Sequence, residues 1–123
     1  MEVFVTDIEK DARRNDFYRR VLSTGDHMQL VLMTLVPGEE IGMEVHKDHD
    51  QFIRVEAGRG SLTLADRSYA LSDGVAAIIP AGVAHNVANT SPDEPLRLYT
   101  LYSPPEHPHG TLHHRKRNEN AAH

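Results

Sequence analysis

The stretch Gly38–Gly60, GEEIGMEVHKDHDQFIRVEAGRG, carries the residues around which the chain is organised. Glu44 and His46 are two positions apart, so on an extended strand their side chains leave by the same face. Gln51 opens the next apolar run, after the short polar break Lys47–Asp50. These three side chains are therefore candidates for one pocket.

A second stretch, Gly74–Asn89, reads GVAAIIPAGVAHNVAN and supplies His85. A metal centre in a small barrel needs a ligand from a strand far away in sequence, because no single strand can surround an ion. The two stretches together predict one site, to which His85 contributes from the second.

The spacing of these residues resembles the two sequence motifs of the cupins. In the first motif five residues separate Gly38 from Glu44, and a single residue separates Glu44 from His46. Four residues then precede Gln51, and six more precede Gly58. The glycine, proline, histidine and asparagine positions of the second motif are all filled, by Gly74, Pro80, Gly82, His85 and Asn89.

The resemblance to small single-domain cupins implies an all-β fold, the cupin-type double-stranded β-helix or jelly-roll β-barrel. It also implies a dimer of barrels that bind a small molecule inside. Where most metal cupins have His, His, Glu and His, this chain has Glu44, His46, Gln51 and His85. Such a set suits a divalent ion (Mn, Fe, Co, Ni or Zn) and leaves two octahedral positions for water or substrate.

Short alternating or apolar runs separated by Gly and Pro also predict a β sandwich or barrel. We expect a tight hairpin at Thr24-Gly25-Asp26, with the positive φ supplied by glycine. The expected strands are Phe17–Ser23, His27–Val36, Ile41–His46, Gln51–Val55, Ser61–Leu64, Tyr69–Leu71, Val75–Ile79, His85–Asn89 and Leu96–Tyr102.

Three segments are expected along the chain. Residues 1–16 form an N-terminal lead-in, in which Met1–Val5 can pair as an edge strand and Asp7–Arg14 can make one or two helical turns. Residues 17–103 form the cupin barrel. Residues 104–123 form a Pro/His/Arg-rich segment and tail, expected to pack over the barrel as far as about residue 111 and to be mobile beyond.

Composition excludes several classes of function. The 123 residues are 39% hydrophobic and 25% charged, which is ordinary for one soluble domain. No apolar run approaches the roughly 20 residues of a membrane span, and no signal peptide is evident, so a cytoplasmic location is expected. A net charge of −5 argues against nucleic acid. Without cysteine, a metal is left with His, carboxylate and amide ligands.

Alternatives remain open at the site. The simplest is that these residues are polar groups lining a dry barrel, hydrogen-bonded to one another. A rival ligand register uses His46, either Asp48 or His49, and His85. Gln51 can either touch the metal or orient another ligand or a water molecule.

Other polar residues have simpler explanations than a role in the pocket. Arg54, Tyr99, Tyr102 and His107 could reach the pocket mouth, but an exposed or interface position is expected more often for each. Arg19-Arg20 is interpreted as a solvated strand surface. The basic cluster at residues 113–117 is interpreted as a mobile end of the chain.

Three functions are compatible with these residues. The first is a metal-dependent enzyme acting on a small sugar-like or keto/enol acid, by isomerase, cyclase or lyase chemistry through an enolate or, alternatively, as a non-haem Fe dioxygenase. In either case a base would come from bound hydroxide, His49, Asp50 or a tyrosine. The second is a non-catalytic cupin that binds a small ligand, and the third is a purely structural barrel.

Overall fold

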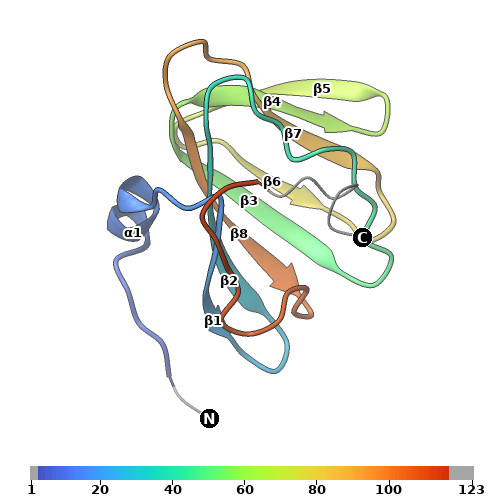
Figure 1. Ribbon diagram of the computed structural model, residues 1–123. Helices are drawn as coiled ribbons and strands as arrows, with labels where there is room; N and C mark the ends of the chain where they lie inside the picture. Colours follow the sequence, from blue (N-terminus) through green and yellow to red (C-terminus); the bar gives the residue numbers. More distant parts are fainter. Residues whose placement is uncertain (1–2, 117–123) are drawn as a thin grey trace.

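The computed structural model describes residues 3–116 and is built mainly of β-strands (Figure 1). All the strand pairs in the described residues are antiparallel, as expected for a jelly roll. No helix in this part of the chain is long and apolar enough to cross a membrane. The elements are α1 Ile8–Arg14, β1 Arg19–Thr24, β2 Gln29–Leu35, β3 Asp50–Ala57, β4 Arg59–Leu64, β5 Arg67–Ser72, β6 Ala76–Ile79, β7 His85–Asn89, β8 Leu96–Ser103 and β9 Leu112–His113.

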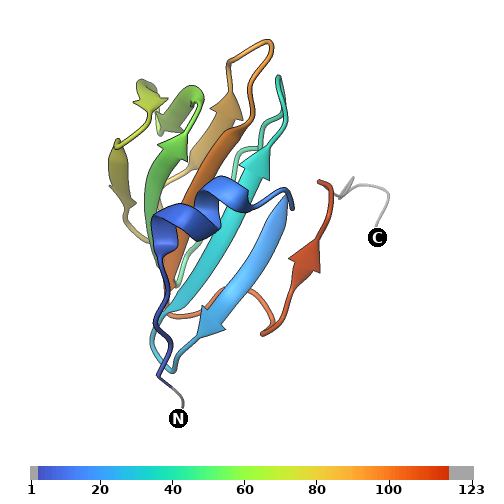
Figure 2. The same cartoon turned by 90° about the vertical axis from the view of Figure 1, so that its left-hand side faces the viewer.

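Two sheets enclose the core. The larger has the strand order β6-β3-β8-β2-β1-β9 and the smaller the order β5-β4-β7. Buried aliphatic side chains of both sheets form one hydrophobic cluster, and α1 lies on the outer face of the larger sheet (Figure 2). The prediction of an all-β jelly-roll barrel is confirmed.

Alternation along the strands sets which side chains face the barrel interior. In β8 the buried residues are every second one from Leu96 to Tyr102, and in β7 they are His85, Val87 and Asn89. In β3 the residues Gln51, Ile53 and Val55 are buried, as predicted. In these two strands the candidate ligands Gln51 and His85 therefore face the barrel interior, on the same side as the core residues.

The predicted strand Ile41–His46 is wrong. The segment forms no continuous ladder with β7. Single bridges join Glu44 to His85 and, just before the segment, Glu40 to Ala88, and Gly42 N–H donates to the Asn86 side chain at 2.9 Å. Gly42 has φ of 107°, a left-handed conformation that interrupts an extended strand. The segment is a loop pinned to the edge of the small sheet.

Two other expectations for the chain's first 30 residues also need correction. Gly25 has no positive φ; the β1–β2 hairpin has a longer loop, closed by a 2.8 Å bond from Gly25 N–H to Met28 O. Residues 3–7 form no strand, and Met1 and Glu2 lie outside the described residues. The helical turns predicted from Asp7 are confirmed as α1, which is capped by the Asp7 side chain on Lys10 N.

The segment after β8 is packed further than predicted. β9 pairs with β1, with Arg19 opposite His113, and Tyr18 N–H donates to His114 O at 3.3 Å. Lys116 Nζ donates to Glu40 O at 2.6 Å, so the basic end is attached to the barrel at least this far. Residue 117 and those after it lie outside the described residues.

We predict that Gly60→Ala destabilises the fold. A Cβ at this position would lie 2.2 Å from the carbonyl oxygen of Ala88, on the neighbouring strand, and 2.9 Å from Cδ2 of Leu96. Such overpacking costs about 1–3 kcal/mol of the free energy of unfolding. Urea denaturation measures it. The control Gly25→Ala, where the nearest atom is 3.5 Å away, should change little, and equal midpoints for the two variants would contradict the close approach of β4 to β7.

Candidate metal centre

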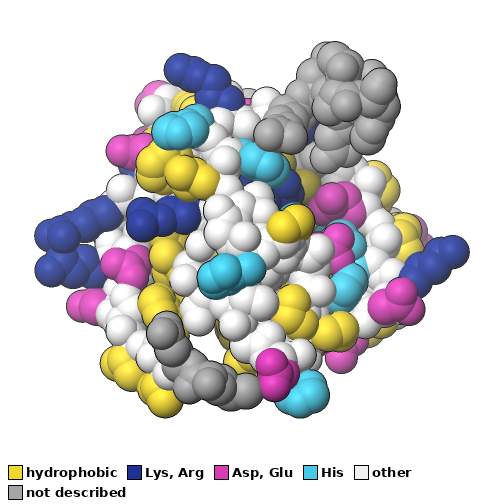
Figure 3. Space-filling model, turned by 60° about the horizontal axis from the view of Figure 1, so that its bottom comes forward, with side chains coloured by type: hydrophobic (Ala, Val, Ile, Leu, Met, Phe, Trp, Pro, Cys, Tyr) yellow, Lys and Arg dark blue, Asp and Glu magenta, His cyan; other side chains and the backbone are white. Residues whose placement is uncertain are grey.

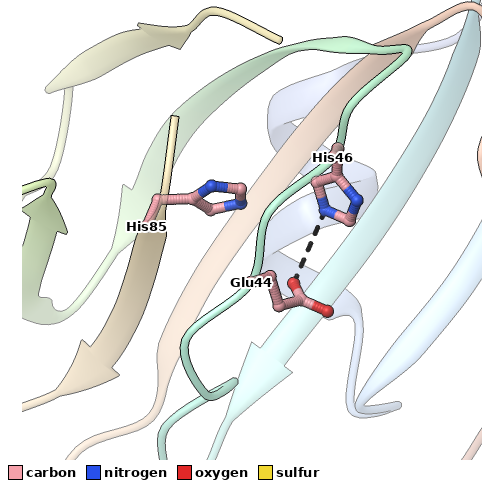
Figure 4. Close-up of side chains that lie close together, drawn as sticks. All are labelled: Glu44, His46 and His85. Carbon is pink, nitrogen blue, oxygen red and sulfur yellow. Dashed lines mark ion pairs between the residues drawn. The ribbon is translucent and has the colours of Figure 1, made fainter. Parts of the chain in front are cut away.

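Backbone hydrogen bonds hold the loop at residues 41–46 against the start of β7. Glu44 N–H donates to His85 O at 2.8 Å, and His85 N–H donates back to Glu44 O at 2.9 Å. Gly82 N–H donates to His46 O at 2.8 Å. Glu44 and His46 are thereby fixed beside His85, which lies far from them in the sequence (Figure 4).

The side chains of Glu44, His46 and His85 converge. One donor atom from each lies within 4.8 Å of the other two, and Nε2 of His46 is 3.7 Å from Oε1 of Glu44. Metal bonds of about 2.0–2.2 Å place neighbouring ligand atoms about 3 Å apart, so modest side-chain adjustment would bring the three around one ion. His85 is buried and Glu44 and His46 are partly buried.

The ring nitrogens that face the centre form no hydrogen bonds. Nδ1 of His85 lies 2.9 Å from Val83 O, so this nitrogen carries the proton and donates. Nε2 of His85 and Nε2 of His46 are buried and make no hydrogen bond. An unpaired buried nitrogen is costly, and a metal ion would satisfy both, so the residues present fit a divalent ion.

Gln51 also has a buried polar atom without a hydrogen bond, its amide oxygen. Its Nε2 donates to Thr100 Oγ1 at 3.0 Å and to the Tyr102 hydroxyl at 3.3 Å. Its Oε1 is buried without a partner. The two donated bonds orient the amide and leave the oxygen available. That Gln51 is the fourth ligand stays a prediction.

The rival ligand register is not supported by the positions of Asp48 and His49. Asp48 is exposed, and His49 uses one ring nitrogen on Glu106 and the other, at 3.0 Å, on Pro104 O. In residues 3–116 the group of histidine and acidic side chains that could share an ion is the one containing Glu44.

Sequence reasoning missed Glu106. Its carboxylate pairs with His49 Nε2 and lies 3.7 Å from Nδ1 of His46. A carboxylate beside Nδ1 favours the tautomer that leaves Nε2 free for a metal. No spacing rule could have found it, because it comes from the Pro/His-rich segment outside both motifs.

We call residues 104–114 the C-terminal strap. Its central turn is held by Gln29, whose buried side-chain oxygen accepts from Glu106 N–H (3.2 Å) and His107 N–H (2.9 Å). Nε2 of Gln29 donates to His107 O at 2.7 Å. The strap thus carries Glu106 to the candidate metal centre from a fixed anchor in β2. On the lower face of the molecule, histidine and acidic side chains lie next to one another (Figure 3).

Two residues that were expected more often at exposed or interface positions line the interior. Tyr102 is buried, with its ring 5.9 Å from that of His46 and 5.2 Å from that of His107. Burial raises the pKa of the Tyr102 hydroxyl well above its usual range, so this group stays protonated. Burial, helped by the charge of Arg19, lowers the pKa of His107 to about 3, which keeps its imidazole neutral.

Arg54 and Tyr99 lie on the outer face of the large sheet, away from the centre. Arg54 pairs with Glu56, and the Tyr99 ring lies 6.2 Å from that of Phe52. Glu56 is buried although the alternation of β3 predicts an outward position; the ladder with β8 has a bulge at this point, between Val55 and Ala57.

The interpretation of Arg19-Arg20 as a solvated strand surface holds for Arg20 but is wrong for Arg19. Arg20 is exposed, but Arg19 is only 9% exposed. Arg19 alternates with Val21, which is in the core, so the pattern of β1 contains the signal. The charge of arginine outweighs that signal when the sequence is read alone.

A comparison with protein-family models decides the family. The model for the cupin domain matches residues 31–102, more than half of the chain. The chain is a cupin. The match runs from the middle of β2 to near the end of β8 and contains all four predicted metal ligands, Glu44, His46, Gln51 and His85.

Similar proteins agree with this assignment. A crystal structure of BH2720 from Bacillus halodurans superposes with a TM-score of 0.88 at 47% identity, covering 92% of this cupin and 89% of that chain. The uncharacterized protein YrkC of Bacillus subtilis is 42% identical over 97% of this cupin, which spans 67% of the length of YrkC.

One relative has a named activity. A quercetin 2,3-dioxygenase of Bacillus subtilis is 38% identical over 79 residues, which are 64% of this cupin and 23% of the dioxygenase. The likeness therefore covers one part of a much longer protein.

We predict that His107 makes the fold sensitive to acid. Its folded pKa of about 3 lies below the ordinary value of 6.5, so as the pH falls the unfolded chain binds a proton here first. The free energy of unfolding should then drop between about pH 6.5 and 3. Urea titrations across this range should show that the free energy of unfolding falls less steeply with pH in His107→Gln than in the parent. The variant His27→Gln, changed at an exposed position, should match the parent. Equal slopes for all three would contradict the burial of a neutral His107.

Proposed function

We propose that this cupin binds one divalent metal ion through Glu44, His46 and His85, with Gln51 as a fourth ligand, and oxygenates a small chelating enol. The observation that carries the proposal is the convergence of two imidazoles and one carboxylate, with both Nε2 atoms buried and without a hydrogen bond. Two histidines with one carboxylate are typical of non-haem Fe(II) oxygenases.

The donor set supports binding of an oxygen-rich substrate. A single carboxylate leaves a divalent centre with net positive charge, and four protein donors leave two octahedral positions. A bound ion would polarise a chelated carbonyl and favour the enolate of a hydroxy-carbonyl compound. Dioxygenation places both atoms of O₂ in the products and draws its electrons from the substrate, so no external reductant is required. The likeness to the quercetin 2,3-dioxygenase supports this class.

A second candidate, isomerisation or lyase chemistry through an enolate, is favoured by the pair His49 and Glu106. Their side chains are in direct contact, and Glu106 Oε1 is 3.7 Å from His46, so a base is placed beside the centre. His49 is partly buried, and the strap holds its partner in place. In this pair the Glu106 carboxylate, oriented by His49, can take a proton from a carbon next to a carbonyl.

We expect untagged protein to hold about one divalent ion per chain, measured by elemental analysis after gel filtration. Because loss of one imidazole removes a metal bond and leaves its neighbours unpaired, His85→Ala should weaken metal binding at least tenfold. The control His27→Ala, at an exposed site, should retain the ion. Stoichiometric metal in His85→Ala would contradict the site and point to metal carried by other histidines.

We further expect oxygen consumption when metal-loaded protein meets a small enolisable hydroxy-ketone or flavonol, followed with an oxygen electrode and by mass spectrometry of products in ¹⁸O₂. Two labelled oxygen atoms in the products support dioxygenation. Exchange of substrate hydrogen for solvent deuterium without oxygen uptake supports the enolate chemistry instead. Tight binding with neither signal would contradict both and leave a binding protein.

A further inference from the structure

Arg19 places a positive charge inside the barrel. It pairs with Met33 in the β1–β2 ladder, and its neighbour Val21 pairs with Val31, so it shares the inner face with core residues. It is 9% exposed, whereas the adjacent Arg20 faces outward and is exposed. The two arginines therefore differ in environment although they are neighbours.

The guanidinium of Arg19 has no carboxylate partner among residues 3–116. Its Nε is buried and makes no hydrogen bond, its NH1 lies 3.5 Å from Nδ1 of His113, and its Cζ lies 5.3 Å from the ring centre of Tyr18. Elsewhere in residues 3–116, Arg13, Arg54 and Arg97 each form an ion pair with a carboxylate.

A buried cation without an anion is unfavourable. A guanidinium cannot lose its proton in a protein, so it cannot become neutral as a buried lysine or histidine does. Contact with the Tyr18 ring and a long contact with an imidazole compensate it only in part. The charge is therefore balanced best when an anion enters the barrel.

The position of Arg19 relates it to the metal centre. Its charge lowers the pKa of His107 and opposes the raised pKa of Tyr102, so its field reaches both residues. Tyr102 has His107 on one side and His46 on another, with ring centres 5.2 and 5.9 Å away. Tyr102 therefore lies beside His46 and within reach of the charge of Arg19.

We propose that Arg19 binds the acid group of the substrate, and that the substrate is a small carboxylate whose enol or hydroxyl oxygen faces Glu44, His46 and His85. The part concerning the metal rests on the proposed function; the anion site itself does not. The planar fork of arginine matches a carboxylate with two parallel hydrogen bonds. Neutral His107 adds a buried Nε2 that has no partner and can donate or accept.

The test compares Arg19→Gln with the matched control Arg20→Gln. The probes are lactate, malonate and inorganic phosphate, with lactamide as the uncharged analogue, and the dissociation constants are measured by calorimetry with and without bound Zn²⁺. Carboxylates should bind the parent and Arg20→Gln alike and Arg19→Gln roughly 10- to 100-fold more weakly. Lactamide should show no such dependence on Arg19. Arg19→Lys should recover part of the affinity.

A second measurement separates binding from a structural role. Without ligand, Arg19→Met should unfold at the same temperature as the parent or higher, since it removes an uncompensated buried charge and keeps a similar volume. A structural role for Arg19 predicts a lower unfolding temperature. A clear drop, together with unchanged carboxylate affinity in Arg19→Gln, would overturn the proposal.

The measurements without Zn²⁺ separate the test of the anion site from the test of the proposed metal centre. Carboxylate binding that depends on Arg19 in protein unable to hold metal would support the anion site and contradict only the metal centre. Stoichiometric metal binding with equal carboxylate affinity in Arg19→Gln and Arg20→Gln would support the metal centre and contradict the anion site. Phosphate binding tighter than carboxylate binding would overturn the assignment of the ligand as a carboxylic acid.

Discussion

The reciprocal backbone hydrogen bonds between Glu44 and His85 are the constraint on which the site depends. They join a loop to the first residue of β7 and set both side chains on the same side of that bridge. The bond from Gly82 N–H to His46 O fixes the second imidazole from the same two segments. Because each of these hydrogen bonds is made by the backbone, the side chains of Glu44, His46 and His85 are positioned without using their own polar atoms. Two imidazole nitrogens can therefore remain buried without a hydrogen bond, as a metal site would require.

The barrel interior divides into two electrostatic regions. Glu44 and Glu106 put carboxylates on the side of the histidines, and the strap anchored on Gln29 keeps Glu106 there. Arg19 puts a cation on the side of β1. With Tyr102 protonated and His107 neutral, a ligand carrying a metal-binding oxygen and an acid group would match both regions. Buried polar atoms without hydrogen bonds, such as Nε of Arg19 and Nε2 of His85, lower the free energy of unfolding. Natural proteins commonly accept this loss of stability at functional sites.

The sequence is sufficient to predict the fold and the meeting of Glu44, His46 and His85, because motif spacing fixes which strand ends share one end of the barrel. It is not sufficient for the local backbone: alternation in the segment from Ile41 suggests a strand, and only the left-handed φ of Gly42 shows that it is a loop. The parts brought in by tertiary packing are also missed. Nothing in the composition of the strap indicates that Gln29 will hold it, or that Glu106 will reach His46.

The most direct test of a shared metal centre is anomalous X-ray diffraction from crystals of the protein grown with Co²⁺ or Fe²⁺. We expect one strong peak about 2.0–2.2 Å from Nε2 of His46, Nε2 of His85 and a carboxylate oxygen of Glu44. A metal peak elsewhere, or none within reach of both imidazoles at saturating metal, would contradict the centre.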